Sequence, residues 1–174
     1  MRWLPFQLNP DLPEAGIPRE EYVARKFGAR GKGVNERVVM AGRQVGIAFA
    51  YEKMAVQPNT LNAHRLMVYA ERSGRQDALA EELFRAHFTD GANLTDRETL
   101  ADVAARAGLD RQAVVDYLAS EEDRSLIAQA DREARGAGIG GVPFFIFDRR
   151  VGVSGAQDAD TLLEAMEQAL QEQG

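Results

Sequence analysis

Apolar residues recur at intervals of three and four along most of the sequence, and this spacing is typical of amphipathic helices. Glycine, proline and polar cap residues interrupt the pattern repeatedly and divide it into separate elements. The pattern predicts seven helices between residues 18 and 136, over residues 18–27, 35–45, 61–73, 76–88, 95–107, 111–119 and 120–135. We therefore expect this part of the chain to be almost entirely helical.

Polar residues mark the starts of several of these helices. Asn35 is placed to cap the second helix, and Asp110 is placed to cap the sixth. Thr95 and Glu98 have the spacing of a capping box at the start of the fifth. The polar, glycine-rich stretch from Gly28 to Gly33 is expected to be a flexible connection between the first two helices.

Two helices carry a clear apolar stripe, the feature that typically faces a core. In the second helix the stripe is formed by Val38, Ala41 and Val45. Asp158 is placed to cap a final helix near the carboxyl end of the chain. The stripe of that helix consists of Leu162, Leu163, Met166, Ala169 and Leu170.

Two stretches outside the helical block predict β-strands. Arg2 to Leu8 mixes aromatic and branched residues around Pro5, which suits a short strand near a sheet edge. Phe144 to Phe147, a turn at Asp148 to Arg150 and then Val151 to Val153 form a β-hairpin signal. The continuous apolar run fits a strand buried on both faces of a sheet. Because one strand precedes the helical block and the hairpin follows it, the two ends of the chain must meet to make one sheet.

The composition is that of a globular protein and argues against several partners. The 174 residues carry a net charge of -6, and no stripe of Lys and Arg interleaved with aromatic residues favours nucleic acid. No apolar run approaches the roughly 18 residues that span a bilayer, and Pro5 interrupts any signal-peptide core. We expect a cytoplasmic protein without a membrane segment.

No residue of the chain is a convincing catalytic or metal-binding group. The sequence has no cysteine, which excludes disulfides, cysteine metal sites and thiol nucleophiles within it. His64 and His87 are the only histidines, and neither has a carboxylate at a recognised metal spacing. The glycines before the hairpin match a dinucleotide fingerprint, but a helix precedes them and a strand follows, which is the wrong order. We expect no catalytic residue, no metal and no cofactor.

The stretch Gly141, Val142 and Pro143, at the entrance to the hairpin, is the candidate binding site. An X-Pro bond in a tight loop can be cis, and proline at the first position of a strand leaves the ladder intact. With a cis bond, the main-chain groups of Val142 are free to pair with an extended peptide, and Gly141 permits close approach. A rigid turn that binds nothing explains the same residues, so both interpretations stay open.

These residues also carry a family resemblance that extends over nearly the whole chain. The sequence resembles the DsbA-like proteins of the thioredoxin fold, in particular their FrnE-like branch. The matching stretches are Trp3 to Pro10 (WLPFQLNP), Tyr22 to Gly28 (YVARKFG), Pro58 to Leu66 (PNTLNAHRL), Gly138 to Phe147 (GIGGVPFFIF) and Val153 to Gln157 (VSGAQ).

The resemblance implies an α/β protein with a thioredoxin-like sheet and a large helical insertion. Residues 1–17 and 137–174 would form the thioredoxin-like domain, and residues 18–136 the insertion. It also implies a cis proline at Pro143 and thiol-disulfide exchange with a peptide or protein substrate by a C-x-x-C pair. The family carries that pair after a first strand, and this chain lacks both strand and pair. We therefore expect an incomplete sheet and a chain that is redox-inactive as written.

An incomplete sheet leaves three possibilities: the sequence starts within a longer protein, the strand at the amino end pairs directly with the hairpin, or two chains complete each other's sheets. Exposed edges favour a homodimer.

Two further functions stay open. One is that of the glutathione-dependent isomerases and kappa-type transferases, which bind glutathione beside the cis proline, and the other is that of a non-catalytic dimeric interaction module.

Overall fold

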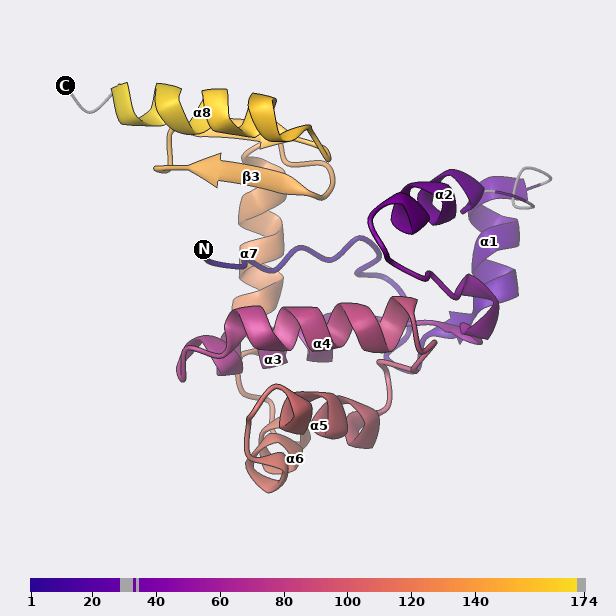
Figure 1. Ribbon diagram of the computed structural model, residues 1–174. Coiled ribbons are helices and arrows are strands. Elements are labelled where there is room, and N and C mark those ends of the chain that lie inside the picture. Colours follow the sequence, from indigo (N-terminus) through magenta and orange to yellow (C-terminus); the bar gives the residue numbers. More distant parts are fainter. Residues whose placement is uncertain (29–32, 34, 172–174) are drawn as a thin grey trace. The chain divides into compact units, whose positions relative to one another are not determined.

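The computed structural model describes residues 1–28, 33 and 35–171 (Figure 1). Packing divides the chain into two compact units, Met1–Ile127 and Ala128–Gly174, which are described here one at a time. The connection expected between Gly28 and Gly33 lies mostly outside the described residues. The helices of the first unit are α1 (Arg19–Phe27), α2 (Glu36–Gln44), the 3-10 turn η2 (Tyr51–Lys53), α3 (Leu61–Glu71), α4 (Gln76–Phe88), α5 (Arg97–Arg106), α6 (Arg111–Ala119) and the start of α7 (Arg124–Gly136).

Helices α3 to α6 enclose the main hydrophobic core of the first unit (Figure 1). Each contributes aliphatic side chains at intervals of three and four, as the sequence pattern predicts. Leu66, Leu79, Leu100 and Leu118, one from each helix, are completely shielded from solvent. Burial of such side chains stabilises a fold by roughly 1.5 to 3 kcal/mol each relative to exposure.

The cap residues explain where two of these helices begin. The side chain of Asp110 accepts a hydrogen bond from the N–H of Ala113 at 2.8 Å, as the sequence predicts. The capping box expected from Thr95 and Glu98 is wrong, because Asp96 caps α5 instead and accepts from the N–H of Thr99 at 3.0 Å. A carboxylate accepts this hydrogen bond more strongly than a hydroxyl, which favours the aspartate.

The segment from Arg2 to Leu8, which the sequence predicts as a strand, is irregular in the structure. It is held by the side-chain amide of Gln76, which accepts a hydrogen bond from the N–H of Trp3 at 2.8 Å and donates to its carbonyl oxygen at 3.0 Å. The indole of Trp3 also donates to Asp77 at 2.6 Å. Gln76 thus supplies the donor and the acceptor that a neighbouring strand would offer.

A two-stranded sheet joins the start of α1 to the segment before α3. Strand β1 (Ile17–Pro18) pairs antiparallel with β2 (Val56–Gln57). Gly16 precedes β1 with a φ of 72°, and a Cβ there would lie 2.6 Å from the carbonyl oxygen of Gln57. A side chain at this position would be both strained and in collision with the sheet, so only glycine fits.

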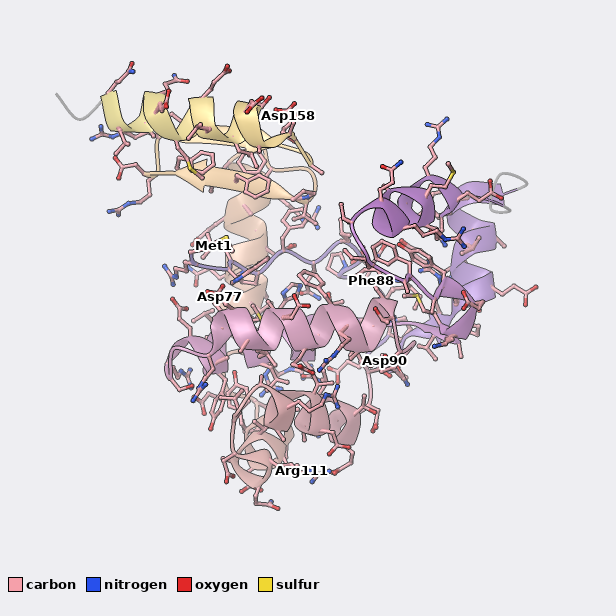
Figure 2. The ribbon with its side chains drawn as sticks, viewed as in Figure 1. Met1, Asp77, Phe88, Asp90, Arg111 and Asp158 are labelled. Carbon is pink, nitrogen blue, oxygen red and sulfur yellow. The ribbon has the colours of Figure 1, made fainter. Side chains whose placement is uncertain are left out.

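The arginine at the start of α1 lies beside two aromatic rings. The guanidinium of Arg19 lies 5.7 Å from the ring centre of Tyr22 and 5.8 Å from that of Tyr51. It also donates a hydrogen bond to the side chain of Gln57. Phe88 lies at the end of α4 (Figure 2). It packs edge-on against Tyr51 with ring centres 6.1 Å apart.

His87, next to this cluster, makes stability depend on pH. Its ring Nδ1 is buried without a hydrogen-bond partner among the described residues. Burial lowers the pKa of His87, the charge of Arg19 lowers it further, and a hydrogen bond to the main chain of Ala92 acts in the opposite direction. The folded state therefore favours the neutral ring.

We expect the free energy of unfolding to fall as the pH drops below about 6.5, the ordinary pKa of histidine, because the unfolded chain then binds a proton that the folded chain resists. Urea titrations of the wild type and of His87→Gln between pH 7.5 and 5.5 measure this effect. The wild type should lose stability over this interval more steeply than the variant. Parallel stability profiles for the two proteins would show that His87 does not titrate differently on folding.

The second unit consists of the end of α7, a β-hairpin and the last helix. Strand β3 (Phe144–Phe147) pairs antiparallel with β4 (Val151–Ser154), and α8 (Ala159–Gln171) lies along the hairpin (Figure 1). The hairpin and the final helix are confirmed. The prediction that both faces of β3 are buried is wrong, since Ile146 is 47% exposed and its strand neighbours are half-buried.

Candidate functional site

The loop between α7 and β3 carries the three residues that the sequence singles out. Helix α7 ends in a tight turn, in which the N–H of Gly138 donates to the carbonyl of Arg135 at 3.0 Å and that of Ile139 to Ala134 at 3.0 Å. Gly138 has a φ of 83° in this turn. The chain then runs through Gly141 to the Val142–Pro143 peptide bond, which is cis.

Pro143 is hydrogen-bonded to the hairpin, whereas Val142 is exposed to solvent. The carbonyl oxygen of Pro143 accepts a hydrogen bond from the N–H of Gly155, just after β4, at 2.9 Å. Val142 is 50% exposed, and among the described residues its main-chain N–H and carbonyl have no hydrogen-bond partner. Unpaired main-chain groups on an exposed residue are available to another extended chain.

The glycines of the loop are surrounded by open space. A Cβ added at Gly140 or at Gly141 would meet no atom within 4 Å. Neither residue has a positive φ. The packing of the described residues therefore does not require glycine at position 141, and a side chain there would project into open space.

The loop has no acid or base of its own. From Gly136 to Phe147 the sequence contains no titratable side chain. In the same unit, Asp158 lies at the start of α8 (Figure 2) and accepts a hydrogen bond from the N–H of Thr161 at 2.8 Å. Hydrogen bonds with Thr161 lower the pKa of the Asp158 carboxyl group. That carboxylate has a structural role at a helix start. The loop therefore has no side chain of its own that could transfer a proton.

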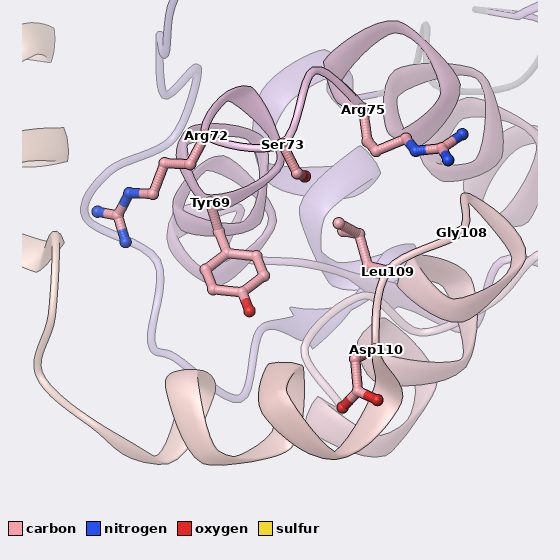
Figure 3. Close-up of a pocket in the computed structure, with 7 residues that line it drawn as sticks. All are labelled: Tyr69, Arg72, Ser73, Arg75, Gly108, Leu109 and Asp110. Carbon is pink, nitrogen blue, oxygen red and sulfur yellow. The ribbon is translucent and has the colours of Figure 1, made fainter.

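A separate hollow lies in the first unit, between the end of α3 and the loops that precede α4 and α6. It encloses about 580 Å³, and Figure 3 shows its lining residues: Tyr69, Arg72, Ser73, Arg75, Gly108, Leu109 and Asp110. Arg72 is paired with Asp123 at 2.5 Å, Ser73 donates to a carbonyl of its own helix, and Asp110 caps α6. Most of its polar groups already serve the fold, so it is the weaker candidate site.

Metal and membrane chemistry have no support in the part of the chain that the structure covers. No group of three or more His, Cys, Asp or Glu side chains in these residues could hold a metal ion. None of the described helices is both long enough and apolar enough to cross a membrane.

Gly141, Val142 and Pro143 are consecutive, and the structure places them in one loop at the entrance to the hairpin. Sequence reasoning did not identify Gly155 as the donor that holds this turn to the hairpin. The only signal for Gly155 is its place in the stretch Val153 to Gln157, which the resemblance includes without a stated role.

The fold and this loop are those of a thioredoxin-fold protein. Comparison with known protein families identifies the family within this fold. The model of the DSBA-like thioredoxin domain matches residues 1–167, so the chain belongs to that family. The structure is similar to the crystal structure of a probable DsbA oxidoreductase from Streptomyces coelicolor, with a TM-score of 0.87 and 31% sequence identity. This match covers 96% of the present chain and 74% of the other. No curated protein matches the sequence. The predicted fold class, a thioredoxin-like α/β protein with a large helical insertion, is thereby confirmed.

Proposed function

We propose that Gly141, Val142 and Pro143 bind the main chain of an extended peptide or protein substrate that carries a thiol or a disulfide. The single observation that carries this proposal is Val142, half exposed and with both main-chain groups unpaired among the described residues. An extended peptide can pair with these groups as an added strand. Membership of a family of thiol-disulfide oxidoreductases supports the thiol or disulfide in the substrate.

Gly141 gives this proposal a direct test. Its neighbourhood is open, so Gly141→Val should fold normally and yet place a branched side chain where the peptide approaches. We expect the dissociation constant of a labelled cysteine-containing peptide to rise about tenfold, the equivalent of one lost hydrogen bond. Fluorescence anisotropy measures the binding, and thermal unfolding checks the fold.

Gly136→Val is the matched control, because a Cβ there also meets nothing within 4 Å but the residue ends α7, outside the loop. This control should bind the peptide like the wild type. Equal affinity of wild type and Gly141→Val would contradict the proposal, and so would a wild type that does not bind the peptide.

In the proposed function this chain binds but does not exchange disulfides by itself. Thiol-disulfide exchange begins with attack by a thiolate, and the sequence contains no cysteine. We expect the purified chain to leave the rate of insulin reduction by dithiothreitol at the level without protein. A clear acceleration, free of contaminating enzymes, would disprove redox inactivity.

Glutathione is the second candidate ligand, because it is itself a short cysteine peptide whose backbone fits the same unpaired groups of Val142. Titration to millimolar glutathione, followed by the amide resonance of Val142, separates this possibility from a preference for longer peptides. Saturable shifts support the glutathione-dependent isomerases and kappa-type transferases as the nearest functional relatives. The predicted domain limits, the FrnE-like branch, the cytoplasmic location and the homodimer remain predictions.

A further inference from the structure

The hairpin of β3 and β4 has a strand edge that continues directly from the loop of Gly141 to Pro143. The two strands form a two-stranded sheet, and no other strand of the described residues joins it. Loop and hairpin both belong to the second unit. In a two-stranded sheet, each strand has one row of N–H and C=O groups that does not face its partner and must be satisfied elsewhere.

The register of the hairpin shows which residues of β3 face β4. In an antiparallel pair, residues that exchange hydrogen bonds with the partner strand alternate with residues whose main-chain groups point away from it. The N–H of Gly155 donates to the carbonyl of Pro143 at 2.9 Å, so Pro143 is a position that faces β4. The register runs on from this pair without a break, so Phe145 and Phe147 face β4 as well.

The residues between these positions, Phe144 and Ile146, therefore direct their main-chain groups to the outer edge of β3. Val142, whose groups have no partner among the described residues, lies two residues before Phe144. Unpaired positions thus recur at every second residue, which in an extended strand places them about 7 Å apart. Another extended main chain presents its N–H and C=O groups at the same spacing, so the fitting occupant is a peptide strand.

The outer edge of β4 is different, because part of it is already satisfied. Ser154 lies opposite Phe144, so its main-chain groups also point outward. Its carbonyl accepts a hydrogen bond from the side-chain amide of Gln157 at 2.9 Å. Among the described residues, no side chain is hydrogen-bonded in this way to Phe144 or Ile146. The edge of β3 is therefore the one open to an added strand.

The side chains along this edge indicate which peptides it favours. Phe145 and Phe147 share one face of β3, with parallel rings whose centres lie 6.5 Å apart, and Phe144 and Ile146 share the other face. Edge strands often carry charged residues that prevent pairing, but Phe144 to Phe147 contains none. Aromatic and β-branched side chains stabilise each other across neighbouring strands. Apolar residues of these types are therefore favoured in the peptide.

We propose that the outer edge of β3 binds the substrate as a third strand, so that the peptide pairs with Phe144 and Ile146 as well as with Val142. The preferred substrate then carries β-branched or aromatic residues on both sides of its cysteine. This inference rests on the proposed function and extends the contact from one residue to the stretch Val142 to Ile146.

Amide hydrogen exchange, followed by NMR in the full chain, tests the added strand residue by residue. The probe is a peptide of about seven residues with a central cysteine flanked by valines. With this peptide at about ten times its dissociation constant, exchange at Phe144 and Ile146 should slow about tenfold, because these N–H groups are open only in the free fraction. Gly152 and Ser154, on the edge of β4, are the internal controls and should exchange as before.

A pair of proline variants tests the same edge by affinity. Ile146→Pro removes an N–H that points away from β4, a position at which edge strands tolerate proline. Ser154→Pro is the matched control, because it removes an outward N–H from the other edge. We expect the dissociation constant of the peptide to rise about tenfold in Ile146→Pro and to stay unchanged in Ser154→Pro. Circular dichroism checks that both variants fold.

Replacing the valines of the peptide with glutamates tests the side-chain preference, and the wild type should bind this peptide about fivefold more weakly. Equal affinity for the two peptides would overturn the preference.

The exchange data separate this inference from the function on which it rests. Binding that shifts the resonance of Val142 but leaves exchange at Phe144 and Ile146 unchanged would overturn the added strand and leave the proposed function intact. A wild type that does not bind the peptide would contradict both. Slow exchange at Phe144 and Ile146 that increases with protein concentration in the absence of peptide would indicate a second copy of the chain at this edge, and would overturn its assignment to substrate.

Discussion

Replacing Arg65 with methionine should lower the free energy of unfolding by about 3 to 5 kcal/mol, the cost of breaking a buried charged network. Arg65 lies in α3 and is completely buried. Its guanidinium donates to the carbonyls of Tyr117 at 2.9 Å and Ser120 at 2.8 Å, and its Nε donates to the carbonyl of Glu122 at 2.8 Å. Methionine fills similar space but removes the hydrogen bonds that Arg65 donates to these carbonyls.

The position of these acceptors explains why the loss should be large. They are the final carbonyls of α6 and the turn after it, where a helix has unpaired acceptors and a partial negative charge. The guanidinium also lies 5.0 Å from the ring centre of Tyr117, whose hydroxyl donates to Asp123 at 2.6 Å. Burial is the main cause that raises the pKa of Tyr117, and the hydrogen bond to Asp123 adds to it.

Urea denaturation followed by circular dichroism measures the loss. Arg97→Met is the matched control, because Arg97 is exposed in the first turn of α5, and its change should stay within about 0.5 kcal/mol. If Arg65→Met unfolds at the same urea concentration as this control, the carbonyl network contributes little and our account of α6 is wrong.

Replacing Leu100 with alanine should lower the free energy of unfolding by about 2 to 5 kcal/mol. Leu100 lies in α5, is completely shielded and belongs to the core that α3 to α6 enclose. Its truncation removes buried apolar atoms and leaves a cavity that the surrounding helices fill only partly.

The same substitution at an exposed leucine separates burial from residue type. Leu4 is 60% exposed in the amino-terminal segment, so Leu4→Ala should change stability by no more than about 0.5 kcal/mol. Thermal and urea unfolding of both variants give the comparison. Similar losses at both positions would mean that Leu100 does not occupy the core of the cooperative unit.

Local signals predicted most of the helices correctly. Helices α4 and α6 have the predicted limits, Gln76 to Phe88 and Arg111 to Ala119. Their starts and stops depend on residues adjacent in sequence, such as the cap at Asp110, so no distant contact is needed to place them. The hairpin was predictable for the same reason, because β3 and β4 are joined by a short turn.

Predictions that depended on distant partners were less successful. The pattern from Arg2 to Leu8 predicts a strand, but in the structure the side chain of Gln76 supplies the hydrogen bonds of Trp3 across 73 positions in sequence. The stripes of α2 and α8 predict a packed face, and the structure leaves much of both exposed. A periodic pattern shows which side chains share a face, but it does not show what lies opposite that face.

For the candidate site too, some features could be predicted from the sequence and others depended on the fold. Gly141, Val142 and Pro143 were identified from the sequence, because proline before a strand and glycine beside it have direct consequences for the main chain. The hydrogen bond from Gly155 to Pro143 and the open space beside Gly141 depend on how the hairpin folds back, and no local pattern contains them.

By itself, the sequence determined the helical segments, the hairpin and the absence of a thiol, since each depends on residue type and short-range spacing. Only the tertiary structure decided that Arg65 is a buried cap for α6 and that Gln76 holds the amino-terminal segment. It also decided that the main-chain groups of Val142 have no hydrogen-bond partner among the described residues. The physical reason is that a hydrogen bond or a buried surface needs two partners, and only folding brings together partners that lie far apart in the chain.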